Sequence, residues 1–262
     1  MKNYKVKNFP DSRIAGIDIG ETGKQKHHIS ALLEIDVTNA RKKIKAYNRK
    51  DEQNISFTAW LISTIAQTIA KHETAGAYRL GKSKLMIFDD VNISLAVEKN
   101  VGGEKVPIPL VIEKAQEISI ASITRQIKDA KNKVITKKEM VLQKKAGKAE
   151  RIYRFLPGFI RRWFWKYLLK HPKLAYKKMG NVAFTSIGMV GKINAWFLPI
   201  SVHPVCFGVS SIVKKPHVVD DEIIIREILN MSVLIDHDVI DGAPMARFIN
   251  ELSISIEKAI NI

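Results

Sequence analysis

The segment Ile235-Asp-His-Asp-Val-Ile-Asp-Gly-Ala-Pro244 decides how this chain of 262 residues is interpreted. It places His237 and Asp241 four positions apart, with Gly242 directly after the aspartate, behind an apolar run. Such a run predicts a buried strand, and the Asp-Gly pair predicts a turn. Residues 243–252 then carry apolar side chains at helical spacing. A histidine between a strand, a turn and a helix can be held rigidly and still face solvent, although spacing alone favours a plain core histidine beside a turn aspartate.

Composition places the chain among globular proteins, with 46% hydrophobic and 26% charged residues. The length suits one large domain or two small ones. No stretch approaches the twenty uninterrupted apolar residues of a membrane span, and the first residues lack the apolar core of a secretion signal. The single Cys206 cannot form an intramolecular disulfide, and its apolar neighbours predict an inert buried thiol. We therefore expect a cytoplasmic protein.

The net charge of +17 is unevenly distributed, because no acidic residue lies between Glu150 and Asp220. Such a field attracts anionic partners: nucleic acid, an acidic lipid surface or a phosphate-bearing cofactor. Charge alone does not choose among these, and a solvated basic surface explains it equally well.

The pattern of apolar residues predicts an α/β protein. Strands are predicted at 29–37, 85–88, 91–97, 106–112, 182–188, 205–213 and 223–235. Helices are predicted at 38–50, 55–72, 119–133 and 243–252. The prolines of the fourth strand suit a sheet edge. We expect one domain over residues 1–262, a two-layer sandwich with helices on one side of a large mixed sheet.

Residues 149–178 do not follow this pattern of apolar strands and helices, because aromatic residues are interleaved with arginines and lysines there. Pro157-Gly158 and His171-Pro172 divide the segment into short helices. Its aromatic side chains can pack on their own domain or on a neighbouring subunit. The part from Tyr153 to Leu168 can instead lie on an acidic membrane surface, which would make the protein peripheral to a membrane. Stacking of single-stranded nucleic acid is the weakest of the three interpretations.

The segment Asp236-His-Asp-Val-Ile-Asp-Gly242 resembles the His-x-x-x-Asp-Gly signature of the dihydrolipoyl acyltransferase (2-oxoacid dehydrogenase acyltransferase) and chloramphenicol acetyltransferase superfamily. Four further segments resemble the same family in the same order: residues 26–38, 90–97, 179–191 and 208–217. The resemblance spans about residues 24–255, apart from the segment after Leu142. It implies a chloramphenicol acetyltransferase-like sandwich that forms a homotrimer, with the active site between subunits. Whether trimers assemble further into cubes stays open.

The resemblance also implies roles for individual residues. His237 would take the proton from an attacking thiol, with a backbone carbonyl holding its second ring nitrogen. A hydroxyl on the strand at 182–188 would hold the oxyanion, a contribution of about 3 kcal/mol. An alignment without gaps places this hydroxyl at Thr185, with Ser186 as the alternative, and Thr185 can equally be a residue that only fills the strand.

Asp241 is expected to hold the histidine loop through hydrogen bonds or an ion pair, and Gly242 to permit the turn. In the chloramphenicol branch an arginine near the N-terminus pairs with this carboxylate, and the nearest candidate here is Arg13. Coenzyme A would be a substrate, although no residue that binds it is identified, and no metal site is expected.

The chain departs from the family at three points. Asp238 replaces the arginine that follows the histidine in most lipoyl-dependent members. No lipoyl or subunit-binding domain is expected, so a lipoyl group would have to be supplied in trans. The basic aromatic insertion at about 142–178 has no counterpart that we identify. The sequence therefore predicts a coenzyme-A-dependent acyltransferase, or alternatively a catalytically weak member that serves as an assembly or membrane-docking module.

Overall fold

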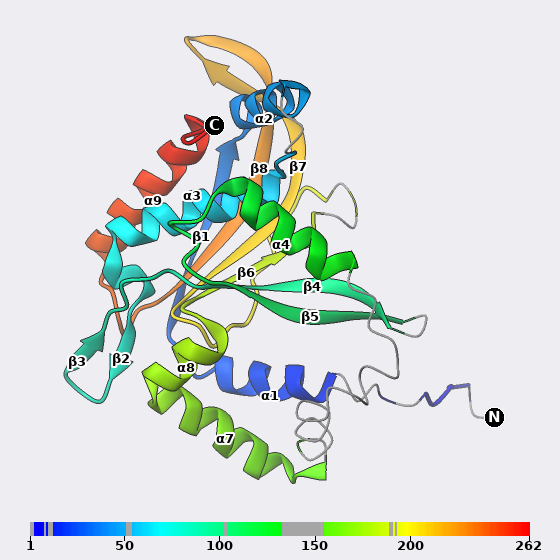
Figure 1. Cartoon of the computed structure of the whole chain (residues 1–262), viewed down its shortest axis with the longest axis vertical. Coiled ribbons are helices and arrows are strands. Elements are labelled where there is room, and N and C mark those ends of the chain that lie inside the picture. Colours follow the sequence, from blue (N-terminus) through cyan, green and yellow to red (C-terminus); the bar gives the residue numbers. More distant parts are fainter. Residues whose placement is uncertain are drawn as a thin grey trace.

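The computed structural model shows a mixed α/β arrangement in which helices cover one face of a six-stranded sheet (Figure 1). The residues that it describes are 3–7, 9, 13–50, 54–101, 104–132, 153, 155–188, 191 and 193–262. The predicted fold class, a two-layer α/β sandwich with a large mixed sheet, is confirmed.

The sheet has the strand order β1-β8-β7-β6-β4-β5. Its strands are β1 (His28–Asp36), β4 (Ile93–Val101), β5 (Glu104–Ile112), β6 (Val182–Ser186), β7 (Val205–Val219) and β8 (Glu222–Asp236). Strand β6 runs parallel to β4 and β7, and the other neighbours are antiparallel. The proline-containing β5 lies at an edge, as predicted, where missing N–H donors are tolerated.

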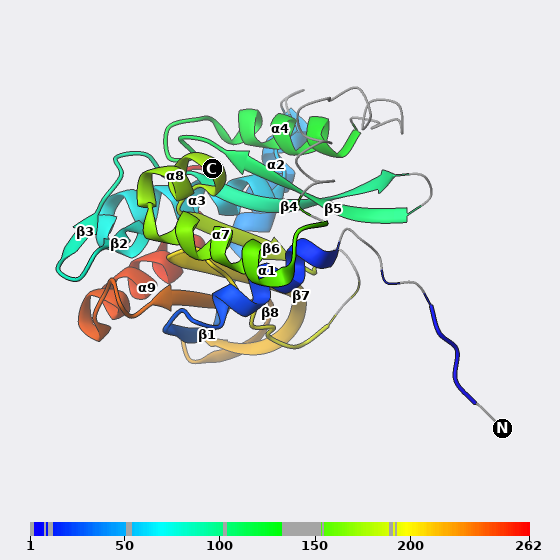
Figure 2. The same ribbon diagram turned by 90° about the horizontal axis from the view of Figure 1, so that it is seen from below.

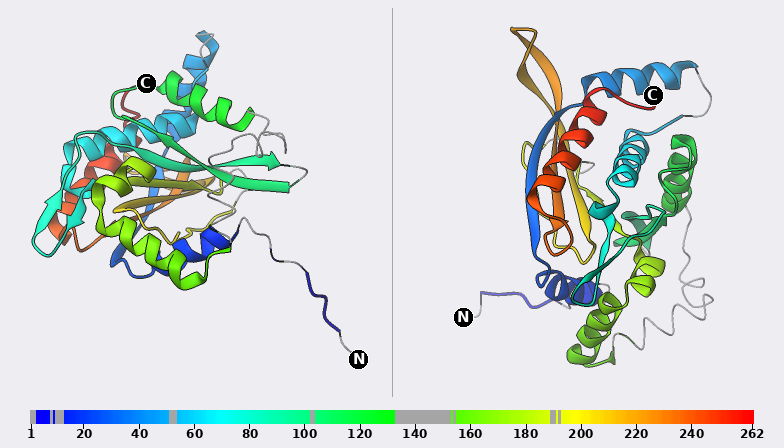
Figure 3. Two further views of the ribbon diagram at one scale, coloured as in Figure 1. Left: turned by 60° about the horizontal axis from the view of Figure 1, so that its bottom comes forward. Right: turned by 90° about the vertical axis from the view of Figure 1, so that its left-hand side faces the viewer.

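Four helices pack on one face of this sheet, as the right-hand view of Figure 3 shows for the cyan, green and red helices. They are α2 (Thr38–Lys50), α3 (Phe57–Lys71), α4 (Ile120–Asn132) and α9 (Gly242–Glu257), which match the predicted helices closely. Alternate residues of β8, Met231, Val233 and Ile235, face these helices and belong to the main core. Strand β8 is therefore fixed by packing up to the residue before His237.

Three further α-helices of the described residues lie together beyond one end of the sheet, at the bottom of Figure 1 and in front in Figure 2. They are α1 (Ile14–Gly23), α7 (Gly158–Lys170) and α8 (Pro172–Met179). The predicted breaks at Pro157 and at His171-Pro172 are confirmed, and residues 142–152 of the insertion lie outside the described residues. Helix α1 was not predicted, because it contains Gly16 and Gly20 and lacks a clear apolar face.

Two predicted strands differ from the observed ones. Strand β7 continues to Val219 rather than ending near residue 213, because its outer half pairs with β8 in a solvent-exposed hairpin. The predicted strand at 85–88 is the short β3 (Lys84–Met86), which pairs with β2 (Tyr78–Leu80) in a separate hairpin. Cys206 is buried, as predicted, and burial raises the pKa of its thiol to about 12.

A glycine positions β6, the strand that carries Thr185. Gly180 follows α8 with φ of +71°, and a Cβ there would lie 2.2 Å from the carbonyl oxygen of Asn92. A side chain would therefore clash with backbone as well as strain φ, which makes glycine necessary at this position. The close approach lets Asn181 and Val182 donate their N–H groups to the same carbonyl, at 3.0 and 3.2 Å.

Candidate functional site

The backbone around His237 is held by contacts between distant parts of the chain. The N–H group of His237 donates to the carbonyl oxygen of His27 at 2.9 Å, and that of Val239 donates to Asp236 at 3.0 Å. The imidazole ring is exposed to solvent. Within the described part of the chain no hydrogen bond reaches the ring, so the expected carbonyl partner of its second nitrogen is not found. His237 thus has a fixed backbone and an accessible ring.

A buried carboxylate next to this histidine anchors the loop. Asp236 is 1% exposed, and its Oδ2 lies 2.5 Å from Nζ of Lys26, which precedes β1. Its Oδ1 accepts the N–H of Asp238 at 3.3 Å, and its own N–H donates to the carbonyl of Pro204 at 2.8 Å. A buried charge requires such compensation, because desolvation is otherwise costly. This pair was not predicted from the sequence, since 210 residues separate Lys26 from Asp236.

Asp238, which departs from the family pattern, makes contacts of its own. Its carboxylate lies 3.0 Å from Nδ1 of His27 and 3.1 Å from Nη1 of Arg79, a residue of β2. These two partners hold the pKa of Asp238 below its usual range, and the bond to His27 contributes most. The negative charge of Asp238 is therefore stabilised by basic groups from two other segments.

A cleft of about 310 Å³ opens between the β2–β3 hairpin and the loop that follows β8. Its lining residues are Arg79, Lys82, Ser83, Lys84, Leu85, His237, Asp238, Val239, Ile240 and Asp241. Arg79 is paired with Asp238, whereas no ion pair of Lys82 or Lys84 occurs within the described residues. The cleft thus combines a free imidazole with two lysines and one carboxylate, that of Asp241, for which the described residues contain no ion pair.

Asp241 and Gly242 do not have the predicted contacts within a single chain. The side chain of Asp241 is exposed and lines the cleft, and among the described residues it has no ion pair and no hydrogen bond. The carbonyl of Asp241 accepts the N–H of Met245 at the start of α9, and the guanidinium of Arg13 lies over the Phe9 ring instead. Nothing lies within 4 Å of a Cβ at Gly242, so this turn does not require glycine. Asp236 provides the loop anchoring that was expected of Asp241.

The structure separates Thr185 from His237 within one chain. Thr185 lies opposite Gly208 in β7, which lies opposite Ser232 in β8. The path from Thr185 to Ser232 crosses two strand spacings of ~4.8 Å each, and His237 lies five positions further along β8 and its loop at ~3.3 Å per residue. Thr185 and His237 are therefore roughly 20 Å apart. Thr185 is half-buried and alternates with the core residue Phe184, so it faces away from the helices, whereas Ser186 is exposed at the strand end.

Two partly buried histidines, His28 and His203, were not predicted to be of interest. His203 hydrogen-bonds to Ser201 Oγ and to the carbonyl of Met179, and burial lowers its pKa to about 4. Burial also lowers the pKa of His28, which hydrogen-bonds to the carbonyl of His203. Both imidazoles are neutral near pH 7 and serve as polar links between β1 and the segment before β7.

The described residues were also compared with the patterns of metal-binding clusters and membrane-spanning helices. No group of three or more histidine, cysteine, aspartate or glutamate side chains is arranged there to hold a metal ion. None of the helices that the structure describes has the length and apolar character needed to cross a bilayer.

The sequence matches a family of known catalytic domains. The family model described as 2-oxoacid dehydrogenases acyltransferase (catalytic domain) matches residues 21–144 and 168–262 and leaves out 145–167. The dihydrolipoyllysine-residue acetyltransferase component of the pyruvate dehydrogenase complex of Corynebacterium glutamicum is 26% identical over 242 residues, which are 88% of this chain and 30% of the relative. The chain spans about a third to a half of the length of curated relatives that it matches.

Solved structures show the same fold. A probable dihydrolipoamide acetyltransferase from Listeria monocytogenes has a TM-score of 0.71 at 22% identity, covering 99% of this chain and 98% of the other. A chloramphenicol acetyltransferase has a TM-score of 0.51 at 7% identity and covers 99% of each chain. The predicted chloramphenicol acetyltransferase-like sandwich is therefore confirmed.

Proposed function

Since the chain belongs to the 2-oxoacid dehydrogenases acyltransferase (catalytic domain) family, we propose that it transfers an acyl group between coenzyme A and a second thiol, with His237 as general base. The observation that carries this proposal is the exposed imidazole that lines a cleft together with Arg79, Lys82 and Lys84, on a backbone held by His27 and Asp236. Fixed backbone and free ring are the combination that proton transfer to a diffusing substrate requires.

The proposed reaction needs a base and an oxyanion donor. His237 takes the proton of the attacking thiol, and the resulting thiolate adds to the carbonyl carbon of the thioester. The carbonyl oxygen becomes an oxyanion, which the hydroxyl of Thr185 stabilises by donating a hydrogen bond. Collapse of this intermediate breaks the original carbon–sulfur bond, and the departing sulfur takes the proton back from His237.

We place this site between two subunits of a homotrimer. Within one chain His237 and Thr185 are roughly 20 Å apart by strand geometry, too far to act on one carbonyl group. Thr185 lies on the sheet face away from the helices, so a neighbouring subunit can bring its His237 to this face.

The free cations of the cleft favour a phosphate-bearing substrate. Lys82 and Lys84 lie on the rim opposite His237 and have no acidic partner within the described residues, so they can bind the phosphate groups of coenzyme A. The second thiol would belong to a lipoyl group, since the relative from Corynebacterium glutamicum is named a dihydrolipoyllysine-residue acetyltransferase. Asp238 would orient Arg79 beside the path that the substrate follows.

Replacement of His237 by alanine tests the base directly. We expect transfer from a panel of short acyl-CoA thioesters to free dihydrolipoamide to fall by about 10²- to 10⁴-fold. His217→Ala is the matched control, because His217 is exposed in the distant β7–β8 hairpin. Unchanged turnover by a folded, oligomeric His237→Ala variant would refute the proposal.

Subunit mixing tests the shared site. Thr185→Ala should lower turnover by about 10²- to 10³-fold, and Thr185→Ser should retain most of it. When His237→Ala and Thr185→Ala chains are assembled together at equal amounts, about a quarter of the interfaces regain both intact residues and hence activity. Absence of any recovery in verified mixed trimers would place the two groups in separate sites.

A further inference from the structure

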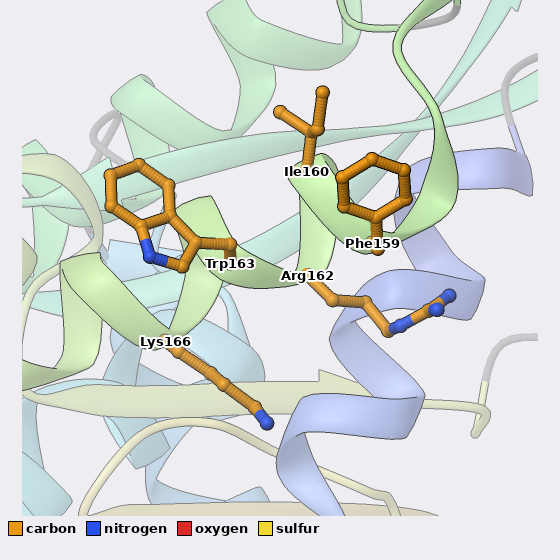
Figure 4. A pocket seen from close by; sticks show the side chains of 5 residues that line it. All are labelled: Phe159, Ile160, Arg162, Trp163 and Lys166. Atoms are coloured by element: carbon orange, nitrogen blue, oxygen red, sulfur yellow. The ribbon is translucent and has the colours of Figure 1, made fainter.

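We propose that the outer face of α7 docks onto the surface of a bilayer that contains anionic lipid. The inference does not depend on the acyl transfer proposed above. It rests on two rows of side chains, each spaced by one helical turn: Phe159, Trp163 and Tyr167 in one row, and Arg162, Lys166 and Lys170 in the next. Figure 4 shows Phe159 and Trp163 with the neighbouring Arg162 and Lys166.

The aromatic row is exposed to solvent and gathers several large side chains on one helix. Phe159 is 67% exposed and Trp163 is 63% exposed, and Phe164 and Tyr167 are exposed as well. With Ile160 and the two cations, Phe159 and Trp163 border a surface hollow of about 590 Å³. Large apolar side chains gathered on one surface mark a site where another apolar phase or molecule binds.

The inner face of α7 is firmly attached to α1. Arg161 donates from Nε to Oδ2 of Asp18 at 2.7 Å, and the hydroxyl of Tyr153 donates to the same oxygen at 2.7 Å. Asp18 is buried, and Trp165 donates from Nε1 to the Tyr153 hydroxyl at 2.9 Å. The helix therefore presents its aromatic row in a fixed orientation.

Charge favours a lipid surface over a second copy of this chain. No acidic residue occurs in the sequence from 151 to 219, and no ion pair of Arg162, Lys166 or Lys170 exists within the described residues. Two copies meeting through this face would bring like charges together. Anionic headgroups instead neutralise the cations while the aromatic side chains enter the interfacial layer.

The ring contacts favour lipid over nucleic acid. Trp163 stacks on Tyr167 with 5.6 Å between ring centroids, and Tyr167 lies 4.0 Å from the ring of His171. Bases of a single strand would need these ring faces free. The family match also omits residues 145–167, so the exposed row lies outside what the family shares.

Vesicle flotation tests the proposal on the full chain. We expect binding to vesicles of phosphatidylcholine with phosphatidylglycerol, loss of binding at high salt, and little binding to phosphatidylcholine alone. The double variant Phe159→Ser with Trp163→Ser should bind at least tenfold more weakly. Ile223→Ser with Ile225→Ser is the matched control, because these isoleucines are equally exposed in the β7–β8 hairpin.

A charge variant separates the two rows. Lys166→Glu with Lys170→Glu should weaken binding at least tenfold, whereas Lys42→Glu with Lys45→Glu, on exposed positions of α2, should change it less. Acyl-transfer activity without vesicles should be unchanged in all four variants. No binding of the wild-type chain to anionic vesicles at low salt overturns the proposal. So does a changed oligomeric mass of the aromatic variant, which indicates a subunit interface, or preferred binding of a single-stranded oligonucleotide.

Discussion

Basic side chains lie around the His237 loop and on the outer face of α7, but within the described residues carboxylates pair only with members of the first group, Lys26, His27 and Arg79. Asp236 is paired with Lys26, and Asp238 with His27 and Arg79. The cations on the outer face of α7 have no acidic partner within the described residues. Within α7 itself, the cation that faces inward is paired and the exposed ones are not, because Arg161 lies against the buried Asp18.

This difference reflects what each region has to do. A site that performs proton transfer needs a rigid backbone, and partly buried charges are stable only when they are compensated. A surface that binds an anionic partner needs cations that remain free until the partner arrives. Compensated charge thus indicates a structural role, and uncompensated charge indicates a binding role.

The largest expected difference between the two regions is the effect of the same lysine substitution on stability. Lys26→Met leaves Asp236 as an unpaired charge that is 2% exposed in its side chain, so we expect a loss of about 3 to 5 kcal/mol in the free energy of unfolding. Lys166→Met, on the outer face of α7, should change it by less than about 0.5 kcal/mol. Urea unfolding at one fixed protein concentration measures both. Equal losses would show that the two lysines do not differ in the way proposed.

Acid should lower the free energy of unfolding through His203, which lies near the His237 loop, and not through the histidine at the end of α7. The pKa of His203 is about 4 in the folded chain and 6.5 in its ordinary state, so the unfolded chain binds more protons between these values. Stability from this residue is therefore complete above pH 6.5 and is lost as the pH falls to 4, by up to about 3 kcal/mol. The lowered pKa of His28 acts in the same direction.

The measurement is unfolding free energy against pH for the wild type and for His203→Gln. The variant should lose much of the slope between pH 6.5 and 4. His171→Gln, at the exposed end of α7, is the control and should keep the wild-type slope. A slope that is identical in all three chains would mean that His203 is not the group that titrates.

The sequence predicted the features that repeat locally or follow a family pattern. The strand before His237, the helix after it and the hydroxyl strand at Thr185 were located because apolar periodicity is a local signal. The compensating partners Lys26 and Arg79 could not be predicted, because each lies in another element and meets its carboxylate only in the fold. The expected role of Asp241 stays a prediction, because its carboxylate has no partner among the described residues of one chain.

Helix α1 shows a second limit of sequence reasoning. Its glycines and its buried Asp18 give no helical apolar face, and it is placed by its contacts with α7. The cationic and aromatic content of α7 was evident from the sequence. Which side chains face outward was not, because that depends on which face α1 covers.

Removing the charge of Asp238 should give the smallest effect of these substitutions, and it tests the role of a compensated charge in the cleft itself. The ion pairs of Asp238 are exposed, with 46% exposure for the Arg79 side chain, so Asp238→Asn should cost less than about 1 kcal/mol of stability. The change frees Arg79 and removes a negative charge beside Lys82 and Lys84. The attraction between the cleft and the phosphate groups of acyl-CoA should then strengthen by about 1 kcal/mol of Coulomb energy. We therefore expect the KM for acyl-CoA to fall several-fold, with kcat unchanged. Asp220→Asn, in the distant β7–β8 turn, removes the same charge and should leave KM unchanged. A rise in KM for Asp238→Asn would instead mean that the pair with Asp238 holds Arg79 in the position where it binds substrate.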